Sequence, residues 1–178
     1  LYPVNLSDIV LTKIENIIKK ISYGFNLNNS PLLIQAIVNN DDISIIEFSP
    51  RLGGGSKYSL INYINNIDII DQYINLILGE NLNLNVRKSN NCMMLNYVYY
   101  TGIYDHLENF NKLKYYGILE EYYEYKTKGM EVNEILSSSD RVAGYLIRDV
   151  NMNMLEAKKE IVSRKIKVLD KNNRNIRS

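Results

Sequence analysis

Two short runs of apolar, largely β-branched residues, separated by four turn-forming residues, constrain the fold of this chain more than any other feature. The runs are residues 31–38 and 43–48, and the sequence Asn-Asn-Asp-Asp at 39–42 lies between them. Isoleucine and valine are common in strands, whereas asparagine and aspartate favour tight turns. The sequence therefore predicts a β-hairpin at residues 31–48.

Helical patterns flank this hairpin on both sides. Upstream, apolar residues recur at helical spacing between the candidate cap Ser7 and Gly24. Downstream, residues 56–78 also have a helical period, which is broken near Asp68 and stopped by Gly79. We therefore expect an α+β fold in which helices accompany an antiparallel hairpin.

The composition of the sequence changes beyond Asn91. Tyrosine-rich segments at 94–100, 115–126 and 141–148 are typical of strands, and a boundary is placed near residue 90. Asn153 and Glu156 match a capping box, which predicts a last helix before a short strand at 166–169. The predicted organisation is a first unit over residues 1–90, a small β-rich unit with a terminal helix over 91–170, and a flexible tail over 171–178.

The predicted hairpin brings oxygen-bearing side chains together. If the turn is a three-residue loop at 40–42, Gln35 lies opposite Glu47. Strand alternation then keeps Ile45, Glu47 and Ser49 on one face, so a carboxylate, an amide oxygen and a hydroxyl converge. Such ligands suit a hard cation, and magnesium is the candidate. A four-residue loop would instead place Glu47 opposite Ile34, so both registers remain open.

Residues just beyond the second strand are suited to phosphate. Arg51 offers a planar charged fork for phosphate oxygens, and the run Gly53-Gly54-Gly55 lets the backbone approach a ligand closely. Two plainer alternatives stay open. Glu47 and Arg51 can form a surface ion pair, and the glycine run can serve only as a flexible connection.

At these residues the sequence resembles the ATP-grasp superfamily. Gln35 and the string Glu47-Phe48-Ser49-Pro50-Arg51 match the hairpin that carries the metal ligands in that superfamily. The resemblance implies that Gln35, Glu47 and Ser49 bind magnesium bridging ATP phosphates, and that Arg51 acts catalytically by stabilising the transferred phosphate. The cofactor-binding residues are then Glu47 and Arg51, with ATP and magnesium as cofactors.

The resemblance also sets expectations for fold and completeness. It implies the carboxyl-terminal part of the ATP-grasp large subdomain, an antiparallel sheet with helices, followed by the small unit. Residues 137–144 resemble carboxylase-like and carbamoyl-phosphate-synthase-like members. The adenine-binding strands, lysines and glycine-rich phosphate loop of the superfamily lie upstream of anything present here. We therefore expect a fragment that is inactive by itself.

The implied function is that of an ATP-dependent, magnesium-requiring ligase. Such an enzyme forms an acyl-phosphate from a small carboxylate and couples it to an amine or a similar nucleophile, as in carbamoyl-phosphate-synthase-like members. The alternative is a non-catalytic nucleotide-binding or interaction module with a degenerate site, because Ser49 stands where asparagine is usual. A homodimer is left open.

Composition argues against several other classes of protein. The formal net charge is +1 and 23% of residues are charged, so we expect no nucleic-acid partner. No apolar run approaches the roughly 20 residues that cross a bilayer, and we expect no membrane segment. The single cysteine, Cys92, and the lack of a signal-peptide pattern favour the cytoplasm. His106, which we expect on a short helix or turn, receives no role. Arg141 either anchors the small unit against the ATP-grasp core, through Asp140 or another acid, or reaches a substrate carboxylate.

Overall fold

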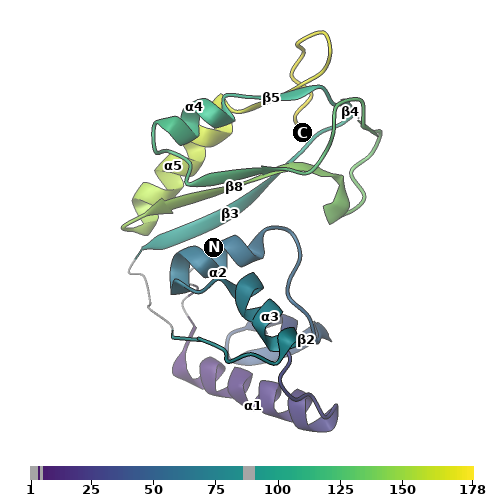
Figure 1. The fold of residues 1–178 in the computed structure, drawn as a ribbon. Coiled ribbons are helices and arrows are strands. Elements are labelled where there is room, and N and C mark those ends of the chain that lie inside the picture. The colour runs from purple at the N-terminus through teal and green to yellow at the C-terminus, as the bar shows by residue number, and fades with distance from the viewer. Residues whose placement is uncertain (1–3, 5, 86–90) are drawn as a thin grey trace. The chain divides into compact units, whose positions relative to one another are not determined.

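The computed structural model describes residue 4, residues 6–85 and residues 91–178 (Figure 1). The chain divides into two compact units, which we describe separately. The amino-terminal unit comprises Val4–Asn62 and Asn66–Val86, and the carboxyl-terminal unit is made mainly of Arg87–Ser178. No helix in the described residues is both long and apolar enough to cross a membrane.

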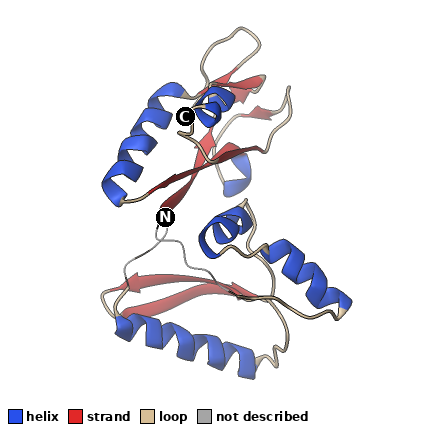
Figure 2. Cartoon of the chain, turned by 60° about the vertical axis from the view of Figure 1, so that its left-hand side comes forward, coloured by secondary structure: helices blue, strands red, loops and turns tan. Residues whose placement is uncertain are grey.

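The amino-terminal unit combines a two-stranded hairpin with helices. Its elements are α1 (Asp8–Gly24), β1 (Leu33–Asn39), β2 (Asp42–Ser49), α2 (Lys57–Asn65) and α3 (Ile69–Leu78). The side chain of Ser7 accepts a hydrogen bond from the Val10 backbone N–H, so the predicted helix cap is confirmed. The α1 helix packs on one face of the hairpin (Figure 2), where the rings of Phe25 and Phe48 lie 4.9 Å apart.

The predicted break near Asp68 separates α2 from α3. The Asp68 carboxylate accepts hydrogen bonds from the N–H groups of Ile70 and Asp71 and thereby caps α3. This helix ends at Gly79, whose φ of +74° is a left-handed conformation that glycine adopts without steric cost. The predicted break near Asp68 and the predicted stop at Gly79 are therefore both confirmed.

The carboxyl-terminal unit is built on a three-stranded antiparallel sheet in the order β3-β8-β6, made of Cys92–Tyr99, Arg141–Asp149 and Glu121–Glu124. Two smaller antiparallel pairs complete the strands, β4 (Gly102–Ile103) with β7 (Glu131–Val132) and β5 (His106–Glu108) with β9 (Lys167–Leu169). The remaining helices are α4 (Phe110–Tyr115), a short 3₁₀ turn (Ser138–Asp140) and α5 (Met152–Lys165). The α+β fold class predicted from the sequence is thus confirmed.

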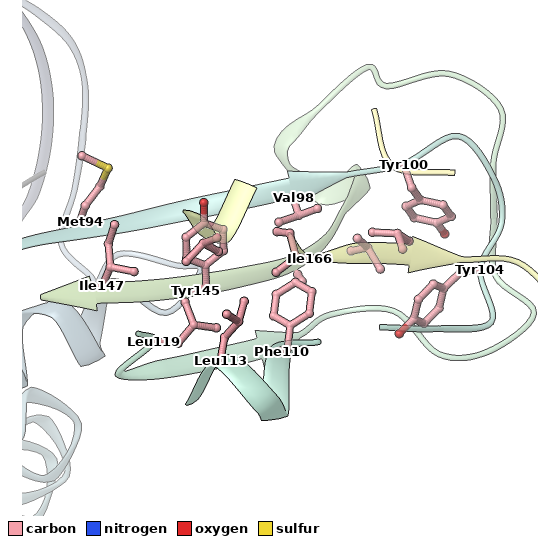
Figure 3. Close-up of a cluster of buried hydrophobic side chains, with 14 of the residues drawn as sticks. Met94, Val98, Tyr100, Tyr104, Phe110, Leu113, Leu119, Tyr145, Ile147 and Ile166 are labelled. Carbon is pink, nitrogen blue, oxygen red and sulfur yellow. The ribbon is translucent and has the colours of Figure 1, made fainter. Parts of the chain in front are cut away.

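Apolar side chains from the sheet and from α4 and α5 form the core of this unit (Figure 3). Phe110 on α4 lies 5.3 Å from the ring of Tyr122 and 6.5 Å from that of Tyr145. Leu155 and Val162 on α5 are fully buried in the same cluster. Burying a side chain of this size stabilises the folded state by about 1.5–3 kcal/mol, so this cluster is the main source of stability of the unit.

Three sequence expectations in this unit need correction. Residues 115–126 do not form one strand, because Gly117 adopts a φ of +68° after α4 and strand β6 starts only at Glu121. The last helix is capped by Asn151, whose side chain accepts from the Met154 N–H, rather than by Asn153. His106 lies on strand β5 rather than on a helix or turn.

Residues 171–178, expected to be a flexible tail, fold back onto the unit. The Thr101 N–H donates to the Ile176 carbonyl at 3.2 Å, and the Ser178 N–H donates to the Tyr99 carbonyl at 3.1 Å. Asp170 is 5% exposed and accepts hydrogen bonds from the backbone and guanidinium of Arg174. The polar composition of this segment suggested a flexible tail, but its polar groups form hydrogen bonds within the carboxyl-terminal unit.

Candidate metal and phosphate site

The register of the hairpin places the predicted ligands together. Gln35 pairs with Glu47, and Leu33 pairs with Ser49. The predicted pairing is confirmed, but the predicted loop is wrong. Asn39 pairs with Asp42 across a two-residue turn, and a bulge on β2 between the Gln35 and Ala36 pairings then shifts the register by one residue.

The same bulge places Ile45 and Glu47 on opposite faces of the hairpin, although simple alternation would place them on one face. Ile45 pairs with Ala36, and both line a cavity against α1. Gln35 directly precedes Ala36 on the unbulged strand β1, so it points to the opposite face, together with its partner Glu47. The expectation that Ile45 shares a face with Glu47 is wrong. One face of the hairpin is thus apolar and covered by α1, whereas the other carries Gln35, Glu47 and Ser49.

The oxygen atoms on this second face fit a magnesium ion that is also held by phosphate. Directly opposed residues of an antiparallel pair have Cβ atoms about 4.5–5.5 Å apart, so Gln35 and Glu47 can both reach one cation. Both side chains are exposed, and Glu47 makes no ion pair within the described residues. No group of three acidic, histidine or cysteine residues in the described ranges could hold a metal alone. Magnesium suits such a site, because it commonly binds through one or two carboxylates plus substrate phosphates.

Arg51 lies immediately after β2 and is fixed by short-range hydrogen bonds. Its backbone N–H donates to the Ser49 carbonyl at 2.8 Å, and its Nη1 donates to the Leu52 carbonyl at 2.9 Å. The alternative surface ion pair between Arg51 and Glu47 does not form in the described part of the chain. The remaining guanidinium donors are exposed and able to bind an oxyanion.

A cleft of about 280 Å³ beside Arg51 adds a second cation to the site. Lys57 and Tyr58 line this cleft together with Arg51 and Gly53, and the other lining side chains are largely apolar. Lys57 is the first residue of α2, directly after the loop of three glycines and Ser56. Sequence reasoning missed Lys57, although its place at the end of a glycine run beside a phosphate-binding candidate was a usable signal.

The three glycines of this loop differ in the space around them and in their backbone conformation. A Cβ on Gly53 would lie 3.3 Å from the Lys57 side chain, whereas one on Gly54 would contact nothing within 4 Å. Gly55 has a φ of +70° and precedes Ser56, which is also left-handed at +60°. The loop is therefore a defined turn into α2 at residues 55 and 56, and Gly53 permits close packing of the Lys57 stem.

Arg141 belongs to the carboxyl-terminal unit, where it is the first residue of β8. Its guanidinium carbon is 4.6 Å from the ring centroid of Tyr97 and 5.3 Å from that of Tyr125, which are stabilising cation–π distances. The neighbouring Asp140 carboxylate instead accepts hydrogen bonds from the N–H groups of Leu136 and Ser137, which lower the pKa of Asp140. These contacts hold the Arg141 guanidinium against two tyrosine rings of its own unit.

Comparison with solved structures shows a shared fold over nearly the whole chain. The chain resembles phosphoribosylglycinamide synthetase from Anaerococcus prevotii, with a TM-score of 0.77 and 17% identity over 96% of this chain and 44% of that one. It resembles L-amino acid ligase from Bacillus licheniformis, with a TM-score of 0.78 and 12% identity over 96% and 43%. It also resembles N5-carboxyaminoimidazole ribonucleotide synthetase from Thermotoga maritima, with a TM-score of 0.70 and 13% identity over 96% and 45%.

These neighbours are ATP-grasp carboxylate–amine ligases. A further structure of the last enzyme type is a complex with ADP, and it matches 91% of this chain with a TM-score of 0.61 and 15% identity. No protein-family model and no curated protein matches the sequence. The chain therefore has the fold of part of an ATP-grasp ligase, and it spans less than half the length of these neighbours.

Proposed function

We propose that this chain supplies the magnesium-binding and phosphate-facing part of an ATP-dependent carboxylate–amine ligase. The observation that carries the proposal is the pairing of Gln35 with Glu47, with Ser49 on the same face of the hairpin. The shared fold with ATP-grasp ligases supports it, as does the ADP held by one of them. ATP and a small carboxylate are the proposed ligands, and the cytoplasm is the proposed compartment.

Each side chain has a distinct task in this proposal. Glu47 provides the one anionic metal ligand, while Gln35 and Ser49 provide neutral oxygens. Bound magnesium would neutralise charge on the ATP phosphates and polarise the transferred phosphoryl group. Arg51, held by the Leu52 carbonyl, binds an oxygen of that phosphoryl group as negative charge shifts during transfer. Lys57 adds positive charge at the same cleft.

The proposed reaction has two steps. A carboxylate oxygen of the substrate attacks the γ-phosphorus of ATP, and ADP leaves with the electrons of the broken P–O bond. An amine then attacks the carbonyl carbon of the acyl-phosphate, loses a proton, and inorganic phosphate leaves. The site residues proposed above hold only the metal and the phosphates and include no adenine pocket, so the 178-residue chain alone should bind ATP only weakly.

A metal-binding measurement on this chain tests the proposal. Paramagnetic Mn²⁺, used in place of Mg²⁺, should broaden the amide NMR signals of residues around Gln35, Glu47 and Ser49, and excess Mg²⁺ should reverse the effect. Glu47→Gln should abolish this broadening, whereas Glu15→Gln on exposed α1 should leave it unchanged. Broadening that persists in Glu47→Gln, or that centres on Asp41 and Asp42 at the turn, would contradict the assignment.

A second candidate is a nucleotide-binding module that has lost catalysis. The specific observation in its favour is that the proposed ligand set contains a single carboxylate, Glu47, beside two neutral oxygens. This module would retain Mg²⁺-dependent nucleotide binding in the complete protein but would release no ADP when supplied with carboxylate and amine. Measuring ADP release separates the two functions.

A further inference from the structure

An apolar groove adjoins the cleft that contains Arg51 and Lys57. The cleft, of about 280 Å³, and a second cavity, of about 320 Å³, are both lined by Pro31, Leu52 and Ile69. The second cavity extends along α3, and its size is at the lower end of the range for small-molecule sites. We call the two together the α3 groove.

The groove is formed because the chain turns back along α3. After Gly79, the Glu80 N–H donates to the Asn75 carbonyl at 2.8 Å, and the Asn83 N–H donates to the Gln72 side-chain oxygen at 2.6 Å. These bonds hold residues 80–85 beside the helix. Leu82 and Leu84 then line the groove together with Leu76 on α3.

Charge is concentrated at one end of the groove. Neither Arg51 nor Lys57 pairs with a carboxylate in the described part of the chain. The acids near the other elements are engaged elsewhere, since Asp68 caps α3 and Asp71 accepts from the Gln72 and Asn75 side chains. A ligand that matches the groove therefore has an anionic group at one end and an apolar body.

We propose that the α3 groove binds a monocarboxylic acid with an apolar chain, its carboxylate held by Arg51 and Lys57. This inference rests on the proposed function, because it identifies that acid as the substrate that receives the phosphoryl group. Arg51 and Lys57 hold the carboxylate beside the face that carries Glu47. The apolar body lies against Leu52, Ile69 and Leu76, so a short acid such as acetate leaves most of the groove unfilled.

Binding of a homologous series of probes to the 178-residue chain tests this inference. Acetate, hexanoate and octanoate should bind with rising affinity, by about fourfold for each methylene that becomes buried. Octanamide, which has the same chain without the charge, should bind at least tenfold more weakly than octanoate. Changes in amide NMR shifts should report the affinities of octanoate and octanamide, and the shifted signals should map to residues 69–84.

Substitutions at two exposed residues distinguish the charged end of the α3 groove from its apolar part. Lys57→Met should reduce octanoate affinity several-fold while leaving octanamide affinity unchanged, whereas Lys19→Met should alter neither. Leu84→Asn should weaken both probes, and Ile77→Asn, at a side chain 68% exposed and outside the groove, should weaken neither.

Equal binding of octanoate and octanamide, shifts that map to the separate cavity between α1 and the hairpin, or undetectable octanoate binding would each overturn this inference. Glu47→Gln distinguishes this failure from failure of the proposed function. Metal-dependent broadening that depends on Glu47 but occurs without octanoate binding overturns only the groove assignment. Octanoate binding without any effect of Glu47→Gln on metal binding overturns the proposed ligase site and leaves the groove as a carboxylate-binding site.

Discussion

Substitution of Gly144 by alanine should destabilise the carboxyl-terminal unit. Gly144 is buried on β8 opposite Tyr97. A Cβ placed there would lie 2.7 Å from the Tyr125 hydroxyl oxygen and 3.3 Å from Cδ1 of Tyr97. The first distance is shorter than real Cβ contacts, so the Tyr125 ring has to move, and with it one of the two aromatic faces that contact Arg141.

The expected magnitude follows from three opposing effects. Overpacking a buried site costs typically about 1–3 kcal/mol. Loss of a cation–π contact adds about 0.5–1 kcal/mol at a partly exposed position. Replacing glycine by alanine within a strand offsets about 0.5–1 kcal/mol of this by reducing the freedom of the unfolded chain. We therefore expect Gly144→Ala to lower the free energy of unfolding by about 2 kcal/mol.

Urea unfolding followed by the amide NMR signals of each unit measures this effect. Gly54→Ala is the matched control, because its Cβ would meet nothing within 4 Å, and it should change stability by less than about 0.5 kcal/mol. Tyr125→Phe removes the closest contact, so its combination with Gly144→Ala should be less destabilised than the sum of the single variants. A stability of Gly144→Ala equal to that of the wild type would refute the steric reasoning.

Three further predictions concern the same unit. Truncation after Asp170 should lower the melting temperature by about 5–10 °C, because it removes partly buried Ile176 and the hydrogen bonds to Tyr99 and Thr101. An unchanged melting temperature would show that residues 171–178 are a flexible tail after all. The Arg174 backbone N–H and guanidinium hold the pKa of Asp170 below its ordinary value. The stabilising contribution of Asp170 should therefore be present above pH about 4 and be lost as the pH falls through the lower folded pKa. The urea midpoints of the wild type and of Asp170→Asn should converge at that low pH. Burial and the hydrogen bond to Glu124 raise the pKa of Tyr104, so its ring NMR signals should show no deprotonation at pH 10.5, where an ordinary tyrosine is largely ionised.

The pairing of the site residues was predictable from the sequence, but by an incomplete argument. A three-residue loop predicts Gln35 opposite Glu47, and the structure reaches the same pairing through a two-residue turn and a bulge. The two-residue turn is explained by Asn40, which adopts a φ of +53° as such turns require. The bulge has no comparable signal, because Ile45, Ile46 and their neighbours would suit either face of a strand. Sequence reasoning therefore placed Ile45 on the wrong face.

Other features depended on contacts between residues that are distant in sequence. Lys57 reaches the cleft of Arg51 only because the turn at Gly55 and Ser56 directs α2 back toward the hairpin. The helix periods of α1 and α3, by contrast, are local and gave the correct elements. Residues 171–178 looked unstructured by composition, yet the buried Asp170 organises them through backbone hydrogen bonds that composition does not reveal.

Measuring ADP release by Glu47 and Gln35 variants of the complete protein tests the central claim most directly. ADP release with carboxylate and amine present should be abolished in Glu47→Gln, because this change removes the single anionic ligand and its Coulomb attraction for magnesium. Gln35→Ala should be impaired less and should recover partly at raised magnesium, since it loses only a neutral oxygen. Circular dichroism first establishes that both variants are folded. Near-normal turnover of folded Glu47→Gln would contradict the metal site and the ligase function proposed from it.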